Sequence, residues 1–293
     1  PEGRRLLERA REFTAPLYAG KTLGTGEDVV RHGDGILESI AALNLDADAR
    51  AAALLYAVPS YLDAADEKLR SAFNPAVADM VAGIYALNAL RVVVRGRDSS
   101  ALKSPGRAPQ IEILRKMFLA MVEDVRVVLL RLASRAQTLR FLTQDAANPY
   151  RDELARETLD LYAPLANRLG VWQLKWTLED LSFRFLEPET YRAVARQLDE
   201  TRAAREQSML RLRDQVAQAM HTQGLQAQVQ GRPKHIYSIV KKMRGKALRF
   251  EQIFDLRALR VVVPTIADCY TALSLVHTQF QPVVEEFDDY IAR

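Results

Sequence analysis

The sequence predicts a mostly α-helical chain with a smaller α/β part at its C-terminal side. Apolar residues recur at helical spacing through most of the first 222 positions, whereas residues 225–230 alternate in the manner of a strand. The chain has 293 residues, of which 48% are hydrophobic, so it is long enough for more than one core. We therefore expect three regions, 1–148, 149–222 and 223–293, of which only the last is α/β.

The first region reads as a series of helices with short breaks. An apolar stripe through residues 6–13 predicts a first helix that ends at Thr14-Ala15-Pro16. Further helices are predicted over 29–43 and 46–58. Another begins at Asn74-Pro75, and its inner face is expected to consist of Val77, Met80, Val81 and Ile84. Residues 95–109 contain Gly, Ser and Pro without a period, so we expect a mobile loop there.

The longest helical pattern runs from Ile111 to Leu139. Apolar residues recur there at spacings of three, four or seven and predict one buried face: Ile111, Leu114, Met117, Met121, Val125, Val128, Leu132 and Leu139. Residues 125–130 alone could form a strand, but the helical period on both sides favours a helix.

The second region begins with a dense apolar series over residues 149–198. Pro164 is expected to divide it and Gly170 to end a helix. Residues 190–221 carry mixed charge and predict a solvated linker helix. An aromatic cluster in this region is expected to belong to the core rather than to a base-stacking surface: Trp172, Trp176, Phe183 and Phe185.

The third region changes character at Gly224. Strands are predicted over 225–230 and 256–263, and a helix over 265–278. Between the strands, a turn with two basic residues, Arg232 and Lys234, leads into a helix with two further basic residues, Lys241 and Lys242. A helix N-terminus with nearby bases suits a phosphate, and Asp255 at a strand edge suits Mg²⁺. The simpler alternatives are a solvated basic helix and an acid that serves as a turn or cap residue.

The composition limits the classes of protein to which the chain can belong. The net charge of +4 permits anionic ligands but does not indicate a nucleic-acid-binding protein, and no DNA partner is expected. No apolar run is long enough to span a bilayer. Cys269 is the single cysteine, which excludes an internal disulfide and fits a reducing cytoplasm. We therefore expect a cytoplasmic protein without a membrane partner.

Several stretches in order resemble one known family. The most specific is Gly231-Arg232-Pro233-Lys234-His235-Ile236-Tyr237-Ser238-Ile239, and 254–258 and 289–292 follow it at familiar spacing. Residues 162–170 and 175–181 resemble the family's connecting helical region. Over essentially its whole length the chain is similar to the long RelA/SpoT homologues, which make and degrade the alarmone (p)ppGpp.

The resemblance implies an HD-type hydrolase domain in the helical half, which in bifunctional members uses Mn²⁺ to remove the 3′-pyrophosphate. His32 is the one residue that matches a ligand of the active form. The other ligand positions hold residues that are poor ligands: Tyr56, Ala57, Ser60, Tyr61, Ser134 and Thr138. One imidazole cannot hold the cation, so a pseudo-hydrolase without Mn²⁺ is implied.

The acidic stretch Glu286-Phe287-Asp288-Asp289 resembles the Glu-x-Asp-Asp of synthetase-only members, whereas bifunctional members carry Arg-x-Lys-Asp. Without the resemblance, a solvated acidic loop would be favoured. With it, the chain resembles the RelA-like, synthetase-only branch, in which Glu286 and Asp288 influence metal or nucleotide preference by analogy.

The implied reaction of the full-length protein moves the β,γ-pyrophosphate of ATP to the 3′-hydroxyl of GTP or GDP. The C-terminal part then resembles the beginning of a nucleotidyltransferase-like synthetase domain, in which Asp255 holds Mg²⁺. Arg232 is assigned to the adenine face or the phosphates. The remaining nucleotide contacts are expected at Lys234, Ser238, Lys242 and Arg260, with Lys241 a weaker candidate.

In the family, a guanine-stacking tyrosine and a second catalytic glutamate come after position 293, so these residues alone are expected to be inactive. The ribosome and uncharged tRNA are expected partners through downstream regions. Two alternatives stay open at this stage. One is a 3′-pyrophosphohydrolase with an atypical site, and the other is a regulatory module that binds nucleotide without chemistry.

Overall fold

The computed structural model describes the backbone of residues 2–97, 124–200, 202–232, 235–250, 253, 258–282, 284 and 287–292. Side chains are described for the same residues except 88–97, 199–206, 208 and 232. The chain separates into two compact units, Pro1–Pro188 (the helical unit) and Glu189–Arg293 (the sheet unit), each described by itself below. This division falls inside the predicted connecting region 149–222, and the three predicted regions stay a prediction.

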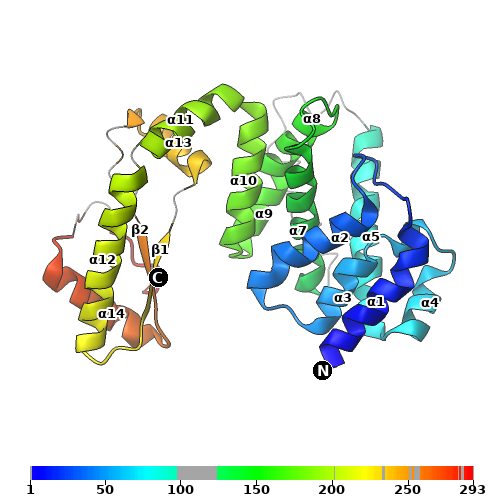
Figure 1. The fold of residues 1–293 in the computed structure, drawn as a ribbon, viewed down its shortest axis with the longest axis horizontal. Coiled ribbons are helices and arrows are strands. Elements are labelled where there is room, and N and C mark those ends of the chain that lie inside the picture. Colours follow the sequence, from blue (N-terminus) through cyan, green and yellow to red (C-terminus); the bar gives the residue numbers. More distant parts are fainter. Residues whose placement is uncertain are drawn as a thin grey trace. The chain divides into compact units, whose positions relative to one another are not determined.

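The helical unit consists of α-helices joined by short turns in its described residues (Figure 1). Its elements are α1 (Glu2–Tyr18), α2 (Val29–Ile40), a 3-10 turn (Ala41–Leu43), α3 (Ala47–Leu55), a 3-10 turn (Val58–Ser60), α4 (Ala65–Ala72), α5 (Pro75–Arg97), α7 (Val125–Leu142), α8 (Arg151–Glu157), a π-helical turn (Thr158–Tyr162), α9 (Ala163–Arg168) and α10 (Trp172–Leu186).

The centre of this unit is α7, which contacts α2, α3, α5, α8 and α10. Most of its side chains from Val127 to Leu142 are buried, including polar ones. α2 can approach α7 closely because it carries Gly35, whose backbone lies directly against Gln137 of α7. The predicted inner face of α5 is confirmed, since Val77, Met80, Val81 and Ile84 are all buried.

Two predicted helix ends are wrong. α1 continues through Pro16 to Tyr18, because the proline removes a single N–H near the helix end while Tyr18 is buried and its hydroxyl accepts a bond from Ala57 N at 3.2 Å. Residues 95–97, predicted as loop, belong to α5, and the rest of that loop lies outside the described residues.

The uninterrupted helix from Ile111 to Leu139 is also wrong where the structure describes it. Asp124 has an extended backbone (φ −115°, ψ 112°) and caps α7 by accepting a hydrogen bond from Arg126 N at 2.9 Å. The guanidinium of Arg126 lowers the pKa of the Asp124 carboxyl. Val125, expected on the buried face, is 52% exposed in the first turn. The prediction of helix rather than strand over 125–130 is confirmed.

The helix before Pro164 contains a π-helical turn. Ala163 N donates to Thr158 O, five residues back, because Pro164 has no N–H with which to continue the ordinary ladder. Gly170 ends α9 with φ +70°, as expected. The predicted aromatic core holds except for Trp172, which is 42% exposed at the start of α10 with Lys175 against its ring.

The sheet unit contains two strands and four helices in its described residues (Figure 1). These are α11 (Pro188–Glu200), α12 (Arg202–Thr222), β1 (Gln228–Arg232), α13 (Ile236–Gly245), β2 (Ala258–Val262) and α14 (Ile266–Gln279). β1 and β2 are antiparallel, with Val229 opposite Val261. One face of this ribbon packs on Val216 and Met220 of α12 and Ala272 of α14.

Three predictions for this unit need correction. The first strand covers 228–232 rather than 225–230, so Gly231 and Arg232 lie in β1 and not in a turn. The charged helix predicted over 190–221 consists of two elements, α11 and α12. α12 is not only a solvated linker, since Val216 and Met220 are buried against the ribbon and α14. The mixed charge of its sequence concealed this narrow apolar stripe.

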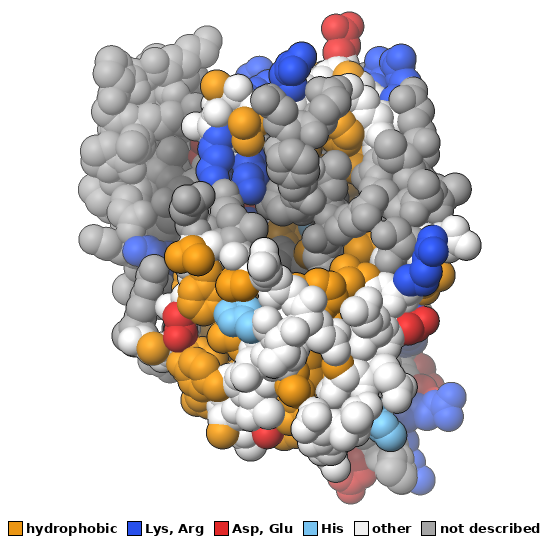
Figure 2. Space-filling view, turned by 90° about the vertical axis from the view of Figure 1, so that its left-hand side faces the viewer, with side chains coloured by type: hydrophobic (Ala, Val, Ile, Leu, Met, Phe, Trp, Pro, Cys, Tyr) orange, Lys and Arg blue, Asp and Glu red, His pale blue; other side chains and the backbone are white. Residues whose placement is uncertain are grey.

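The lower part of the face drawn in Figure 2 displays hydrophobic side chains with few charges among them. In the sheet unit, the exposed large hydrophobic residues of β2, α14 and the segment after it are Val262, Ile266, Tyr270, Val284, Phe287, Tyr290 and Ile291. None of the helices in the described ranges combines the length and the hydropathy needed to cross a bilayer.

The close approach of α2 to α7 yields a stability prediction. A Cβ at Gly35 would lie 2.1 Å from Gln137 Cδ, whereas a Cβ at Gly33 would meet nothing closer than 3.5 Å. We expect Gly35→Ala to lower the free energy of unfolding by about 1–3 kcal/mol through overpacking.

Gly33→Ala, on the same helix, is the control, and we expect it to be neutral or to stabilise by up to about 1 kcal/mol through helix propensity. Urea denaturation followed by circular dichroism gives both values. Equal stability of the two variants would show that Gln137 can move aside without cost.

Candidate functional site

The basic residues predicted to bind phosphate are distributed over both strands and one helix of the sheet unit. Arg232 is the last residue of β1, where it pairs with Ala258, and Arg260 lies two residues further along β2. Arg260 is exposed on the polar face of the ribbon, opposite Gln230. The antiparallel register therefore brings positions 232 and 260 close together from distant parts of the sequence.

α13 carries the predicted contacts Ser238, Lys241 and Lys242. It begins at Ile236, and its N-cap residue His235 makes no side-chain capping bond. Lys242 belongs to the last turn, roughly 9 Å along the axis from Ile236 at 1.5 Å per residue. An anion at the positive end of the helix dipole would thus meet Ser238 first, and the lysines only through their long side chains.

A cavity of about 380 Å³ opens beside α13. Its lining residues are Tyr237, Val240, Lys241, Arg244 and Gly245. Two cationic side chains on one wall suit an anionic ligand. This cavity is the feature of the sheet unit that best fits the phosphate site expected from the sequence.

Three predicted site residues, Lys234, Asp255 and Glu286, lie outside the described residues, so their roles stay predictions. Asp288 is described and exposed, and its Oδ2 accepts a hydrogen bond from the Tyr290 hydroxyl at 3.3 Å. Its neighbour Asp289 accepts from the Tyr270 hydroxyl at 3.2 Å. The described part of the acidic stretch thus bonds with nearby tyrosines.

In the helical unit, His32 is the centre of a buried hydrogen-bond network that joins α2 to α7. Its Nδ1 donates to Glu27 Oε2 at 2.7 Å, and its Nε2 lies 2.8 Å from Ser134 Oγ. The second oxygen of Glu27 accepts from Gln137 Nε2 at 2.6 Å. Glu27 is completely buried and His32 is 1% exposed. A carboxylate that orients an imidazole in this way is typical of metal-binding and catalytic histidines.

Three of the other degenerate positions, Tyr56, Ala57 and Tyr61, pack around His32 and Tyr18, whereas Ser60 is exposed. The Tyr56 ring lies 5.0 Å from the His32 ring, and burial raises the pKa of both the Tyr56 and the Tyr18 hydroxyl. The Ala57 N–H donates to Tyr18, and the Tyr61 ring lies edge-on to the Tyr18 ring. These neutral phenols offer a cation no charged ligand. Among the described residues, no three His, Cys, Asp or Glu side chains are close enough to hold a metal ion.

This donor set does not fit Mn²⁺. Both nitrogens of His32 are within hydrogen-bond distance of protein groups, and the carboxylate beside it is used twice. The chain Ser134–His32–Glu27 has the order hydroxyl, imidazole, carboxylate that nucleophilic hydrolases use. However, Ser134 lies within α7, whose interior N–H groups are used by the helix and form no oxyanion hole there.

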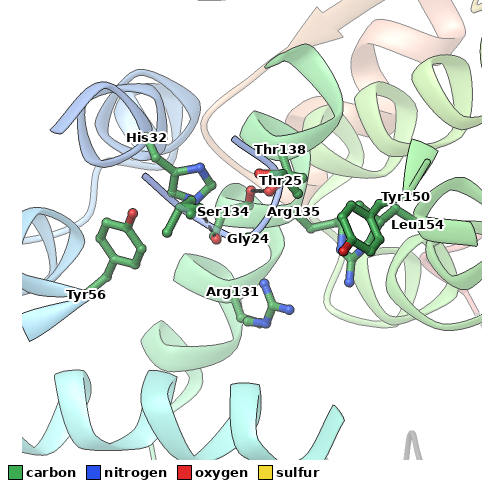
Figure 3. A pocket seen from close by; sticks show the side chains of 11 residues that line it. Gly24, Thr25, His32, Tyr56, Arg131, Ser134, Arg135, Thr138, Tyr150 and Leu154 are labelled. Atoms are coloured by element: carbon green, nitrogen blue, oxygen red, sulfur yellow. Dashed lines mark hydrogen bonds between the residues drawn. The ribbon is translucent and has the colours of Figure 1, made fainter. Parts of the chain in front are cut away.

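Beside this network lies a cavity of about 360 Å³ (Figure 3). Its lining residues are Leu23, Gly24, Thr25, His32, Tyr56, Arg131, Ser134, Arg135, Thr138, Tyr150 and Leu154. Tyr56 and His32 lie towards one end, Tyr150 and Leu154 towards the other, and Arg131 projects between them. Arg131 and Arg135 are 6% and 1% exposed, so the cavity has a cationic wall.

Sequence reasoning found His32 and Ser134 but missed Glu27, Arg131, Arg135 and Gln137. A usable pattern was present in α7. Arg131, Ser134, Arg135 and Thr138 follow the spacing i, i+3, i+4 and i+7, which places them on one helix face. That face is polar within a helix expected to be buried, which is the mark of a lined cavity rather than of a solvated surface.

Comparisons with known proteins agree with this division. Residues 10–172 match the family described as "HD domain", and residues 231–293 match the "Region found in RelA / SpoT proteins". The first of these matches covers most of the helical unit and the second lies within the sheet unit.

Curated relatives extend across both units. GTP pyrophosphokinase of Photobacterium angustum is 39% identical over 260 residues, which is 89% of this chain and 34% of the relative. The Escherichia coli K12 protein of the same name is 39% identical over 257 residues, 88% of this chain and 34% of the relative. A probable guanosine-3′,5′-bis(diphosphate) 3′-pyrophosphohydrolase of Synechocystis is 37% identical over 288 residues, which is 98% of this chain and 36% of the relative. The chain thus spans about a third of the length of these relatives.

The buried network yields a second stability prediction. Ser134→Ala leaves the buried His32 Nε2 without its protein partner, so we expect the free energy of unfolding to fall by about 1–3 kcal/mol. Thr177→Ala is the control, because this exposed hydroxyl only donates to Gln173 O of its own helix. Its effect should stay within about 0.5 kcal/mol in the same denaturation experiment. A Ser134→Ala variant as stable as the control would mean that water replaces the serine at no cost.

Proposed function

Because the chain belongs to the RelA/SpoT family, we propose that the protein containing it synthesises (p)ppGpp, transferring pyrophosphate from ATP to the 3′-hydroxyl of GTP or GDP. The proposal rests on two relatives that are named GTP pyrophosphokinase. Each is 39% identical to this chain over 88–89% of the chain's length. The observation in the structure that supports it is the basic surface of the sheet unit, where Lys241 and Arg244 line a cavity and Arg260 is exposed.

In the proposed reaction the 3′-hydroxyl oxygen attacks the β-phosphorus in line. The bond from that phosphorus to the oxygen shared with the α-phosphate breaks, AMP leaves with that oxygen, and the proton of the 3′-hydroxyl is released to solvent. Little covalent chemistry falls to the protein, so its contribution is positioning and neutralisation of charge. Ser238, Lys241 and Lys242 would hold the ATP phosphates from α13, together with Lys234, while Arg232 and Arg260 act from the ribbon.

Mg²⁺ at Asp255 would supply further neutralisation of the phosphate oxygens. Glu286 and Asp288 would tune the preference for metal or nucleotide. We further propose that these 293 residues alone make little or no product, that the protein acts in the cytoplasm, and that the ribosome and uncharged tRNA act through other regions of the longer protein.

The second candidate function is 3′-pyrophosphohydrolysis, the activity in the name of the Synechocystis relative. It would need a cation at the cavity of the helical unit. Two observations argue against it. Both nitrogens of His32 already have protein partners. The other ligand positions offer only phenol, methyl and hydroxyl groups, which are poor ligands: Tyr56, Ala57, Ser60 and Thr138. We therefore propose that the helical unit does not hydrolyse (p)ppGpp and acts in regulation.

The synthetase proposal predicts a specific loss of activity. In the protein of the relatives' full length, Asp255→Asn should lower the rate of (p)ppGpp formation from labelled ATP and GDP by about 10²–10³, as expected when a charge-stabilising group is removed. Tyr56→Phe, in the other unit, should leave that rate unchanged.

Thin-layer chromatography of the products measures both rates. Failure of the unsubstituted protein to make alarmone, even with ribosomes, would contradict the proposed activity. Efficient synthesis by these 293 residues alone would contradict the proposed dependence on other regions.

The absence of hydrolysis can be tested directly. Incubation of the 293-residue chain with ppGpp and Mn²⁺ should release no pyrophosphate, because the donor set at His32 does not fit the cation. A bifunctional homologue under the same conditions serves as the positive control. Pyrophosphate release that disappears in His32→Ala would instead establish an atypical hydrolase site.

A further inference from the structure

The segment after α14 runs back along that helix. Its Phe287 ring lies edge-on to the His277 ring, with the ring centroids 6.0 Å apart. Two residues later, Asp289 Oδ2 accepts a hydrogen bond from the Tyr270 hydroxyl at 3.2 Å. Tyr270 and His277 are seven residues apart in α14 and therefore lie on one face of it, about two turns from each other. The chain from 287 to 289 thus passes from the later turn of the helix to the earlier one.

Asp289 is the residue that attaches this segment. One carboxylate oxygen, Oδ1, accepts from the backbone N–H groups of Ile291 and Ala292 at 2.8 and 3.1 Å. The other oxygen, Oδ2, accepts from Tyr270. The side chain therefore closes a local turn and fastens that turn to α14. Its burial agrees, because Asp289 is half-buried whereas residues 287–288 and 290–292 on either side of it are exposed.

The neighbouring carboxylate is placed differently. Asp288 is exposed, and its Oδ2 accepts from the Tyr290 hydroxyl of the same segment at 3.3 Å. Because the two acids are consecutive in the chain, the bond that holds Asp289 against α14 also limits the positions that Asp288 can adopt. Two adjacent acids thus differ in role: Asp289 contacts the helix, and Asp288 is accessible to solvent.

The hydrogen bond between Tyr270 and Asp289, called the anchor below, has a useful chemistry. The pKa of the Tyr270 hydroxyl is raised by partial burial and further by the Asp289 carboxylate, so the phenol stays protonated and remains a donor. A phenol holds a carboxylate without adding a positive charge, which a lysine or an arginine in its place would bring. The segment is therefore fixed on α14 while it stays acidic.

The consequence for the reaction rests on the proposed synthetase function, in which Glu286 and Asp288 tune the preference for metal or nucleotide. We propose that Asp289 is a positioning residue for that reaction: the anchor holds the acidic stretch on α14, and the choice between GTP and GDP depends on it. Asp289 acts through its neighbours rather than by contact with a ligand, since both of its oxygens accept hydrogen bonds from the protein.

The preference between acceptors is the suitable measurement, because GTP carries one more phosphate group than GDP. A carboxylate that moves changes the repulsion on the two nucleotides by different amounts, whereas general damage to the fold lowers both rates together. In the protein of the relatives' full length, kcat/KM is measured for GTP and for GDP at saturating ATP. The ratio of the two values is the acceptor preference.

We expect Asp289→Ala to change this ratio by about 2–10-fold, the range of a single hydrogen bond, in the same direction as Asp288→Asn. Tyr270→Phe should change it in that direction by a smaller factor. Its addition to Asp289→Ala should have no further effect, because both substitutions remove the same bond. Tyr85→Phe makes the same chemical change at an exposed tyrosine of the helical unit and should leave the ratio unchanged.

Hydrogen–deuterium exchange tests the anchor without turnover. In Tyr270→Phe the ring stays and only the hydroxyl is lost, so the variant should fold and its circular dichroism should equal that of the unsubstituted protein. Exchange of the backbone amides of 287–292 should nevertheless become faster, because the turn is no longer fastened to α14. In Tyr85→Phe the exchange of these residues should not change.

Unchanged exchange in Tyr270→Phe would show that the anchor does not hold the segment. An unchanged acceptor ratio in Asp289→Ala would show that the anchor has no positioning role. Either result, in a protein that makes alarmone, would overturn this inference alone. The absence of alarmone from the unsubstituted protein would instead overturn the proposed function, and this inference with it.

Discussion

The helical unit depends on the buried contact between α2 and α7. Glu27 is completely buried, which is tolerable only because His32 and Gln137 each donate a hydrogen bond to it. The bond from Gln137 to Glu27 and the contact of His32 with Ser134 specify a single register between the helices, since a shift by one residue would break both. Gly35 allows the approach that the network requires. The same bonds use the imidazole that a metal centre would need, so the packing of the unit and its chemistry are determined by one set of atoms.

The two units arrange positive charge in opposite ways. In the sheet unit, Lys241 and Arg260 are exposed and hydrated, so they can meet a highly charged ligand at little cost before it binds. In the helical unit, Arg131 and Arg135 are almost completely buried, so they have already lost most of their hydration when the chain folds. Exposed cations favour rapid encounter with many anions, whereas buried ones favour selection by shape. The two units therefore differ in how their cations can meet an anion.

Much of the fold could be predicted because periodicity reports burial. The inner face of α5, the helical state of 125–130 and the end of α9 at Gly170 all followed from local pattern. Errors arose where tertiary contacts override local preference. α1 continues past Pro16 because Tyr18 is held by Ala57, and α12 is buried on a stripe that its charges conceal. The candidate site was predicted only in part for the same reason. Glu27 and Arg131 acquire their roles from partners that are distant in sequence.

The π-helical turn at Thr158–Tyr162 has a consequence for the history of the chain. A π turn is an α-helix into which one residue has been inserted, and the residues after it are rotated by about 100° relative to those before it. Tyr162 closes this turn and faces both arginines. A relative with an ordinary helix here would be one residue shorter and would direct a different side chain at the guanidiniums. The gain or loss of a single codon between positions 158 and 162 would thus decide whether a relative has an aromatic ring against the two arginines.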